Sequence, residues 1–134
     1  MIEIRNLHKH FISKDAKVHA VDDVSLSIGD GEVYGIMGYS GAGKSTLVRC
    51  LNFLEIPESG TVEISGFGAV SSEGGKLYLK EDKGARPLSE KELRQLRRSM
   101  GMIFQHFNLL DRSTVFDNIA QVKQFHTETG IGFI

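Results

Sequence analysis

Hydrophobic and polar residues alternate along much of the first 28 positions of the chain. Residues 2–11 and 18–28 both place hydrophobic side chains at loosely alternating positions, namely Ile2, Ile4, Leu7, Val21, Val24, Leu26 and Ile28. Successive side chains of a strand point to opposite faces, so this period predicts two strands that are each exposed on one face. Strands of that kind are typical of an antiparallel sheet.

A continuous hydrophobic pattern follows the turn predicted at residues 29–31. Residues 32–37 predict a strand that is buried on both faces, as in a parallel sheet. Residues 46–54 have helical character, and we expect this helix to end near residues 54–56, because Pro57 disfavours helical geometry in the residue before it.

Shorter elements are predicted in the second half of the chain. Residues 61–64 alternate cleanly and predict a further strand. Residues 67–87 are rich in Gly, Ser and charge, and they predict a surface insertion with a hairpin whose tip is Gly74 and Gly75.

Two helices and one strand are predicted after this insertion. Ser89 and Glu92 form a capping box, which predicts a helix through about Arg98. Residues 102–104 predict a short strand. A last helix is predicted from Ser113, and its hydrophobic face consists of Val115, Phe116, Ile119 and Ala120.

The composition limits the chain to one domain at most and gives no general attraction to nucleic acid. It has 134 residues, of which 40% are hydrophobic and 25% charged, with a net charge of −1. No aromatic residues interleave with Arg94, Arg97 and Arg98, so we interpret this cluster as a solvated helix face. No stretch approaches the roughly 18 hydrophobic residues that cross a bilayer, and we expect a cytoplasmic protein. The lone Cys50 is interpreted as a buried structural thiol.

The chemistry of the chain is concentrated between the predicted buried strand and the helix that follows it. Glycine at one position, then four residues, then Gly-Lys-Ser is the Walker A pattern of a P-loop, made here by Gly38, Tyr39, Ser40, Gly41, Ala42, Gly43, Lys44, Ser45 and Thr46. Glycines let backbone amides surround an anion, and the helix directs its positive dipole end to the same point. Lys44 would bind the β- and γ-phosphates, and the Ser45 hydroxyl would bind Mg²⁺. The alternative is a Gly-rich turn without a nucleotide.

Two later stretches join the P-loop in a family resemblance: residues 102–110, which contain Gln105, and residues 114–120. Together they resemble the nucleotide-binding subunits of ABC transporters, and among these the ATPases of bacterial methionine importers. The resemblance implies an α/β P-loop NTPase fold, here the N-terminal part of the domain, with an antiparallel β subdomain and an incomplete parallel core. It covers roughly residues 1–66 and 88–120.

Roles for individual residues follow from the resemblance. Phe11 takes the place of the aromatic residue that stacks on adenine, although it could instead simply close the first strand. Gln105 matches the glutamine that approaches Mg²⁺ and the attacking water, although it could be an amide that caps a loop. Phe107, Leu109 and Leu110 are expected to form a hydrophobic patch beside it. We assign no metal site to His8, His10 or His106.

The same resemblance implies ATP and Mg²⁺ as ligands, and a membrane permease and a second ATPase subunit as partners, on the inner face of the plasma membrane. We therefore expect a partial ABC ATPase domain at residues 1–120, with the insertion 67–87. Residues 121–134 do not resemble the family's continuation. Such a tail is expected after a frameshift, a premature stop or deliberate shortening. Signature and Walker B segments are not found in the sequence, so the 134 residues are expected to hydrolyse ATP negligibly.

Three readings stay open at this point. The first is the ATPase subunit of an importer. The second is a nonfunctional remnant that at most binds ATP. The third is a different P-loop enzyme, such as a small kinase or GTPase, which would leave the stretch around Gln105 unexplained.

Overall fold

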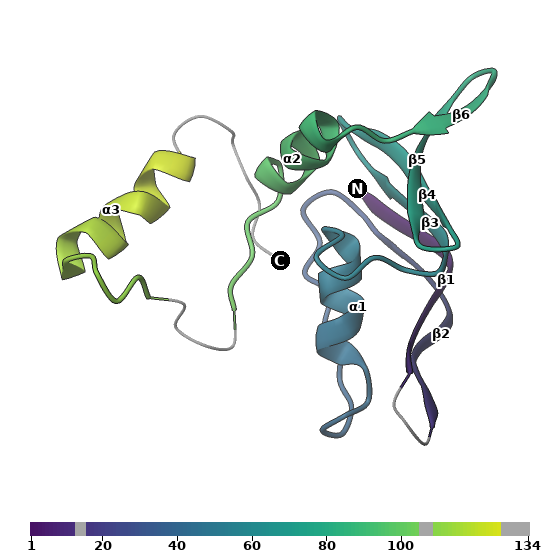
Figure 1. Cartoon of the computed structure of the whole chain (residues 1–134), viewed down its shortest axis with the longest axis horizontal. Coiled ribbons are helices and arrows are strands. Elements are labelled where there is room, and N and C mark those ends of the chain that lie inside the picture. Colours follow the sequence, from purple (N-terminus) through teal and green to yellow (C-terminus); the bar gives the residue numbers. More distant parts are fainter. Residues whose placement is uncertain (13–15, 105–108, 127–134) are drawn as a thin grey trace. The chain divides into compact units, whose positions relative to one another are not determined.

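An antiparallel sheet organises the first of two units of the chain. The structure is a computed structural model, and it describes residues 1–12, 16–104 and 109–126, without the side chains of residues 121–126. The units are Met1–Ser89 and Glu90–Ile134. The described strands of the sheet are β1 (Ile2–Ile12), β2 (Lys17–Ile28), β3 (Ser59–Ile64), β4 (Gly68–Glu73), β5 (Lys76–Glu81) and β6 (Gly84–Pro87). Their order is β2-β1-β3-β4-β5-β6 (Figure 1).

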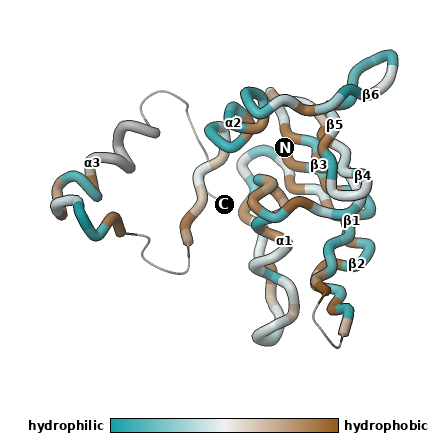
Figure 2. Tube along the Cα trace, viewed as in Figure 1, coloured by the Kyte–Doolittle hydropathy of each residue, from teal (hydrophilic) through white to brown (hydrophobic). Residues whose placement is uncertain are grey.

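The alternating pattern of the N-terminal stretches is confirmed as the pair β1 and β2. Ile4 pairs with Leu26 on β2 and with Val62 on β3, so β1 lies in the interior of the sheet. Ile4, Leu7 and Val62 are buried, and hydrophobic positions recur along β1 and β3 in Figure 2. The prediction of a strand at residues 61–64 is also confirmed, by β3.

The predicted insertion forms three strands that continue the sheet. Gly74 and Gly75 have φ values of 57° and 75°, the geometry of a two-residue hairpin turn, and they join β4 to β5 as predicted. Val70, Ser71 and Ser72 of β4 are buried, and the Ser72 hydroxyl donates a hydrogen bond to the carbonyl of Pro57. The segment is therefore part of the core as well as of the surface.

Helix α1 (Lys44–Leu51) lies alongside the sheet in this unit (Figure 1) and buries Leu47, Cys50 and Leu51. It ends three residues earlier than predicted. The stop is local, because Asn52 is the C-cap and Phe53 adopts a left-handed φ of 55°. The Phe53 side chain is buried, so the turn adds a hydrophobic residue to the core.

The prediction of a buried strand at residues 32–37 is wrong. These residues have no regular secondary structure, and the side chains of Val33 and Met37 are 101% and 94% exposed. A buried parallel strand needs neighbours on both edges, and no strand in the described ranges pairs with this segment. The strand predicted at residues 102–104 is likewise not formed, and Ile103 is exposed.

The second unit contains α2 (Glu90–Arg98) and α3 (Val115–His126). Helix α2 begins directly after Ser89, as the capping pattern predicts. Helix α3 begins later than predicted, because Thr114 and Asp117 cap it. The Thr114 hydroxyl accepts a hydrogen bond from the amide of Asp117 at 3.1 Å, and the Asp117 carboxylate accepts one from the Thr114 hydroxyl at 2.7 Å.

The hydrophobic face predicted for α3 is not covered at its described positions, since Val115, Phe116 and Ile119 are exposed. Within the described residues, none of the helices combines the length and the hydrophobicity that crossing a bilayer requires.

Candidate phosphate-binding site

The loop before α1 takes its shape from two glycines with positive φ. Gly41 and Gly43 both have φ of 82°, a conformation that side-chain-bearing residues rarely adopt. Between them, the amide of Ala42 donates a hydrogen bond to the Tyr39 carbonyl at 3.2 Å, which closes a tight turn. Gly43 is the N-cap of α1 and lies against the backbone of Ala20 in β2. The sheet therefore fixes the place where the loop becomes a helix.

The ammonium group of Lys44 reaches back across this loop. Its Nζ donates hydrogen bonds to the carbonyl oxygens of Gly38 at 2.7 Å and Tyr39 at 2.6 Å. These two bonds hold a full positive charge over the start of the loop. Because bonds between a charged donor and a neutral carbonyl can be exchanged for bonds to an anion, the charge is available to phosphate oxygens.

Unpaired backbone donors at the start of α1 add to this charge. The amide of Leu47 makes the first hydrogen bond of the helix, to the Gly43 carbonyl at 2.8 Å. The amides of Lys44, Ser45 and Thr46 precede that bond, so helix geometry leaves them without acceptors in the preceding turn. The helix dipole places partial positive charge at the same end.

This donor set fits the phosphates of a nucleotide together with a divalent cation. The loop offers one ammonium, several backbone amides and the hydroxyls of Ser45 and Thr46 within a few consecutive residues. The amides and the ammonium suit phosphate oxygens, and a hydroxyl oxygen suits Mg²⁺. The P-loop pattern is local, so sequence reasoning could propose phosphate and Mg²⁺ roles for each of these residues, and those roles stay predictions.

Phe11, the predicted adenine-stacking residue, lies near the end of β1 and is half-exposed. The Nζ atom of Lys9 lies 5.2 Å from the centroid of its ring. Sequence reasoning did not find Lys9 or its partner Glu58, because they meet through the pairing of β1 with the segment that precedes β3. No local pattern signals that contact.

Several other predicted site residues lie outside the described residues or at exposed positions. Gln105, His106 and Phe107 are outside the described residues, whereas Leu109 and Leu110 are described and exposed.

The structure gives three of the histidines acidic neighbours. His8 Nδ1 lies 3.2 Å from Asp22 Oδ1, and His10 Nδ1 lies 3.3 Å from Glu58 Oε2. His8 Nε2 also lies 3.7 Å from Asp23 Oδ1, and His19 Nδ1 lies 4.0 Å from Asp22 Oδ1. In the parts of the chain that the structure describes, no three His, Cys, Asp or Glu residues are arranged to hold a metal ion.

Comparison with known proteins supports the resemblance seen in the sequence. The family described as "ABC transporter" matches residues 21–132. A methionine import ATP-binding protein of Oceanobacillus iheyensis is 47% identical over 120 residues, and one of Cupriavidus pinatubonensis is 52% identical. Each alignment covers 90% of this chain and 30% of the relative, so the chain spans about 30% of the length of these relatives.

A solved structure supports the fold prediction. The dimeric ATP-binding cassette MJ0796, in a post-hydrolysis state bound to ADP and Pi, superposes with a TM-score of 0.72 at 28% identity. The superposition covers 98% of this chain and 50% of that one. The predicted fold class, the N-terminal part of a P-loop nucleotide-binding domain, is confirmed.

Proposed function

Because the chain belongs to the ABC transporter family, we propose that it supplies the ATP-binding part of the ATPase subunit of an amino-acid importer, with methionine as the substrate. The names of the relatives support the substrate. The observation that carries the nucleotide proposal is Lys44, whose ammonium lies over the loop carbonyls of Gly38 and Tyr39 beside the free amides of α1.

Each part of the nucleotide has a proposed partner in the chain. Residues 38–46 hold the phosphates through backbone amides, and Lys44 contacts the β- and γ-phosphates. The Ser45 hydroxyl binds Mg²⁺, which neutralises charge on the phosphates when it is bound. Phe11 stacks on adenine, and Gln105 approaches Mg²⁺ and the attacking water.

The proposed partners are a membrane permease and a second ATPase subunit. The segment around Gln105 would contact the permease, since Leu109 and Leu110 next to it are exposed and hydrophobic. This arrangement places the protein on the inner face of the plasma membrane, with residues 1–120 as its ATPase portion. The dimeric state of the superposed cassette supports a second subunit.

Binding and hydrolysis are expected to separate in this chain. The loop of residues 38–46 is formed within the described residues, whereas the sequence contains no recognisable Walker B segment, which in the family carries the catalytic carboxylates. A general base contributes about 10²- to 10⁴-fold to the rate of such reactions. We therefore propose that the 134 residues by themselves bind ATP and Mg²⁺ and hydrolyse ATP negligibly.

Titration with a fluorescent ATP analogue and Mg²⁺ tests this proposal. The wild-type chain should show saturable binding, and Lys44→Ala should weaken it at least about 100-fold, because two bonds to a charged donor are lost at the phosphates. Lys76→Ala is the matched control, since Lys76 is an exposed lysine on β5. Equal affinities of the Lys44→Ala and Lys76→Ala chains would exclude residues 38–46 as the site.

The alternative, a nonfunctional remnant that at most binds ATP, is favoured by one observation. Residues 33–37 lead into the loop, and several of their side chains are exposed instead of packed in a sheet. If a folded wild-type chain shows no saturable binding, the loop needs a packed strand before it, and the remnant is the correct description.

A further inference from the structure

Lys9 is held at three points by groups that surround its ammonium. Nζ donates hydrogen bonds to the carbonyl oxygen of Ile56 at 2.9 Å and to Glu58 Oε1 at 3.4 Å. It also lies 5.2 Å from the centroid of the Phe11 ring. The Lys9 side chain is only 13% exposed, so these contacts replace most of its hydration. A lysine held in this way has a defined position rather than many rotamers.

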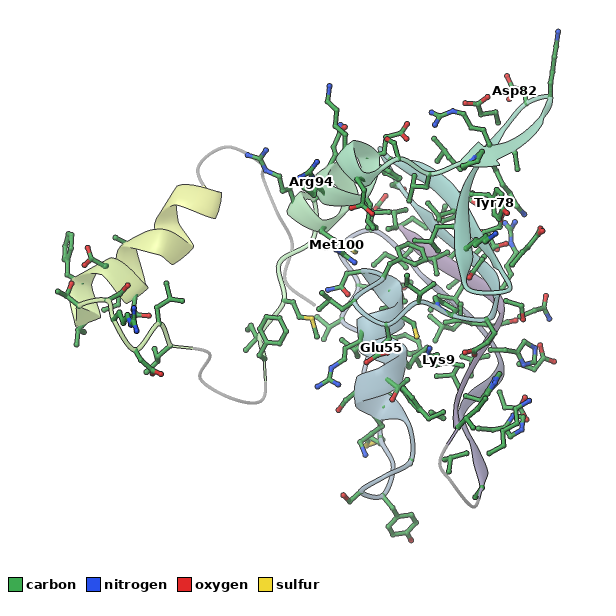
Figure 3. The ribbon with its side chains drawn as sticks, viewed as in Figure 1. Lys9, Glu55, Tyr78, Asp82, Arg94 and Met100 are labelled. Carbon is green, nitrogen blue, oxygen red and sulfur yellow. The ribbon has the colours of Figure 1, made fainter. Side chains whose placement is uncertain are left out.

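The partner carboxylate is itself fixed to β1. The amide of His10 donates a hydrogen bond to Glu58 Oε2 at 2.8 Å, and the amide of Glu58 donates one to the His8 carbonyl at 3.0 Å. Glu58 therefore stays beside β1 whether or not Lys9 is present. Figure 3 shows Lys9 between β1 and the connection that leaves α1. The ammonium joins the strand that bears Phe11 to the segment that follows the phosphate-binding helix.

The fixed Lys9 ammonium restricts the orientation of the Phe11 ring. A cation near the face of an aromatic ring is attracted by the ring quadrupole, more strongly where the cation is shielded from water. Phe11 is half-exposed, and without this attraction its ring would sample several orientations. Restricting the ring in the free protein lowers the entropy that is lost when a base stacks on it.

We propose that Lys9 is a positioning residue for the nucleotide base, because its fixed ammonium orients the Phe11 ring while leaving part of that ring open to a ligand. The inference rests on the proposed function, in which Phe11 stacks on adenine. It adds a residue that touches neither the phosphates nor the base.

Separate affinities for the base and for the phosphates test this role. Binding of ATP and of inorganic tripolyphosphate, each with Mg²⁺, is measured by competition against the fluorescent analogue for four chains: wild type, Lys9→Met, Lys9→Arg and Phe11→Ala. Lys9→Met should weaken ATP about three- to tenfold and leave tripolyphosphate within twofold. Lys9→Arg should restore ATP affinity, since a guanidinium can keep the ring contact. Lys80→Met, which removes the charge of an exposed lysine on β5, should change neither.

A double variant shows whether Lys9 works through the ring. If it does, Lys9→Met added to Phe11→Ala should cause no further loss of ATP affinity. A folded Lys9→Met chain with unchanged ATP affinity would overturn the inference, and so would an equal loss for ATP and tripolyphosphate, which indicates a structural role.

A measurement without ligand separates this inference from the proposed function. In chains labelled with 4-fluorophenylalanine, the ¹⁹F resonance of position 11 is assigned by its absence in Phe11→Leu. Lys9→Met should shift that resonance toward the value of a mobile ring, and Lys9→Arg should do so less. If wild type binds neither ATP nor tripolyphosphate, the proposed function fails, and the base-positioning role of Lys9 fails with it. A shifted resonance in Lys9→Met would in that case show only that Lys9 restricts the Phe11 ring. An unchanged resonance overturns the inference even where ATP binds.

Discussion

A Cβ atom added to Gly43 would lie 1.8 Å from the carbonyl oxygen of Ala20. Atoms cannot approach so closely, and Gly43 also has φ of 82°. The N-terminus of α1 is therefore in direct backbone contact with β2, and this contact requires glycine. The third glycine of the P-loop pattern therefore has a structural role, in addition to the phosphate contact proposed for it.

Gly43→Ala should destabilise the chain much more than Gly41→Ala. Both glycines have φ of 82°, but an added Cβ at Gly41 meets nothing within 4 Å. The Gly41 variant should cost about 1–2 kcal/mol for the left-handed conformation. The Gly43 variant adds a clash with the backbone and should cost at least about 2 kcal/mol more. Urea unfolding without nucleotide measures both, and equal midpoints would contradict the contact with Ala20.

Cys50 should be unreactive in the folded chain. Burial raises the pKa of its thiol to about 12, so little thiolate is present near pH 8. Alkylation by iodoacetamide at that pH should be at least about 100-fold slower than in urea, where the thiol has its ordinary pKa. Comparable rates with and without urea would show that Cys50 is accessible.

The same thiol should make stability fall in alkali. The unfolded chain releases the thiol proton near pH 9.0, whereas the folded chain holds it to about pH 12. The stabilisation from the buried neutral thiol is therefore complete below pH 9 and is lost as the pH rises from 9 toward 12. Other groups titrate in this range, so the test is a comparison. The free energy of unfolding of Cys50→Ala should fall less steeply than that of wild type over the same interval.

Glu58 should contribute to stability at neutral pH and lose that contribution in acid. Partial burial acts to raise the pKa of its carboxyl group, but the hydrogen bond from the His10 amide and the charge of Lys9 outweigh burial and lower it. The folded chain thus favours the carboxylate, and its stabilisation is present above about pH 4.5 and lost as the pH falls below that value.

Unfolding midpoints between pH 3 and pH 7 test this expectation. Glu58→Gln should be less stable than wild type at pH 7, and its stability should change less between pH 4.5 and pH 3. Glu73→Gln is the control, because Glu73 is exposed at the end of β4. If the three chains show parallel profiles, Glu58 is not part of the network around Lys9.

The start of α3 should depend on Thr114. Its hydroxyl accepts the amide of Asp117, so Thr114→Val removes the cap while keeping the shape of the side chain. Loss of an N-cap costs about 1 kcal/mol. Hydrogen exchange at the amides of residues 117–120 should accelerate about fivefold, and Ser113→Ala should leave it unchanged. Acceleration by both variants alike would point to general fraying of the segment instead of loss of a cap.

The sequence predicted features that depend on nearby residues. The P-loop needs only its own pattern, the tip at Gly74 and Gly75 needs only two adjacent glycines, and β1 shows its period directly. Sequence-based prediction failed where the position of a residue depends on partners that are distant along the chain. Residues 32–37 are hydrophobic enough for a buried strand, yet no described strand pairs with them. The contact of Lys9 with Glu58 exists only because β1 aligns with the start of β3, which no spacing reveals.

The pairing of β1 with β3 has a consequence for the order of folding. β2 follows β1 through a short connection, and β3 to β6 follow one another in the same way, so both halves of the sheet can form locally. The pairing of Ile4 with Val62 instead closes a long loop that contains residues 38–46 and α1. Closing this loop costs more entropy than closing the short connections, so we expect β1 to pair with β3 after the local pairings have formed. In that order residues 38–46 would gain their final shape only when the two halves of the sheet join.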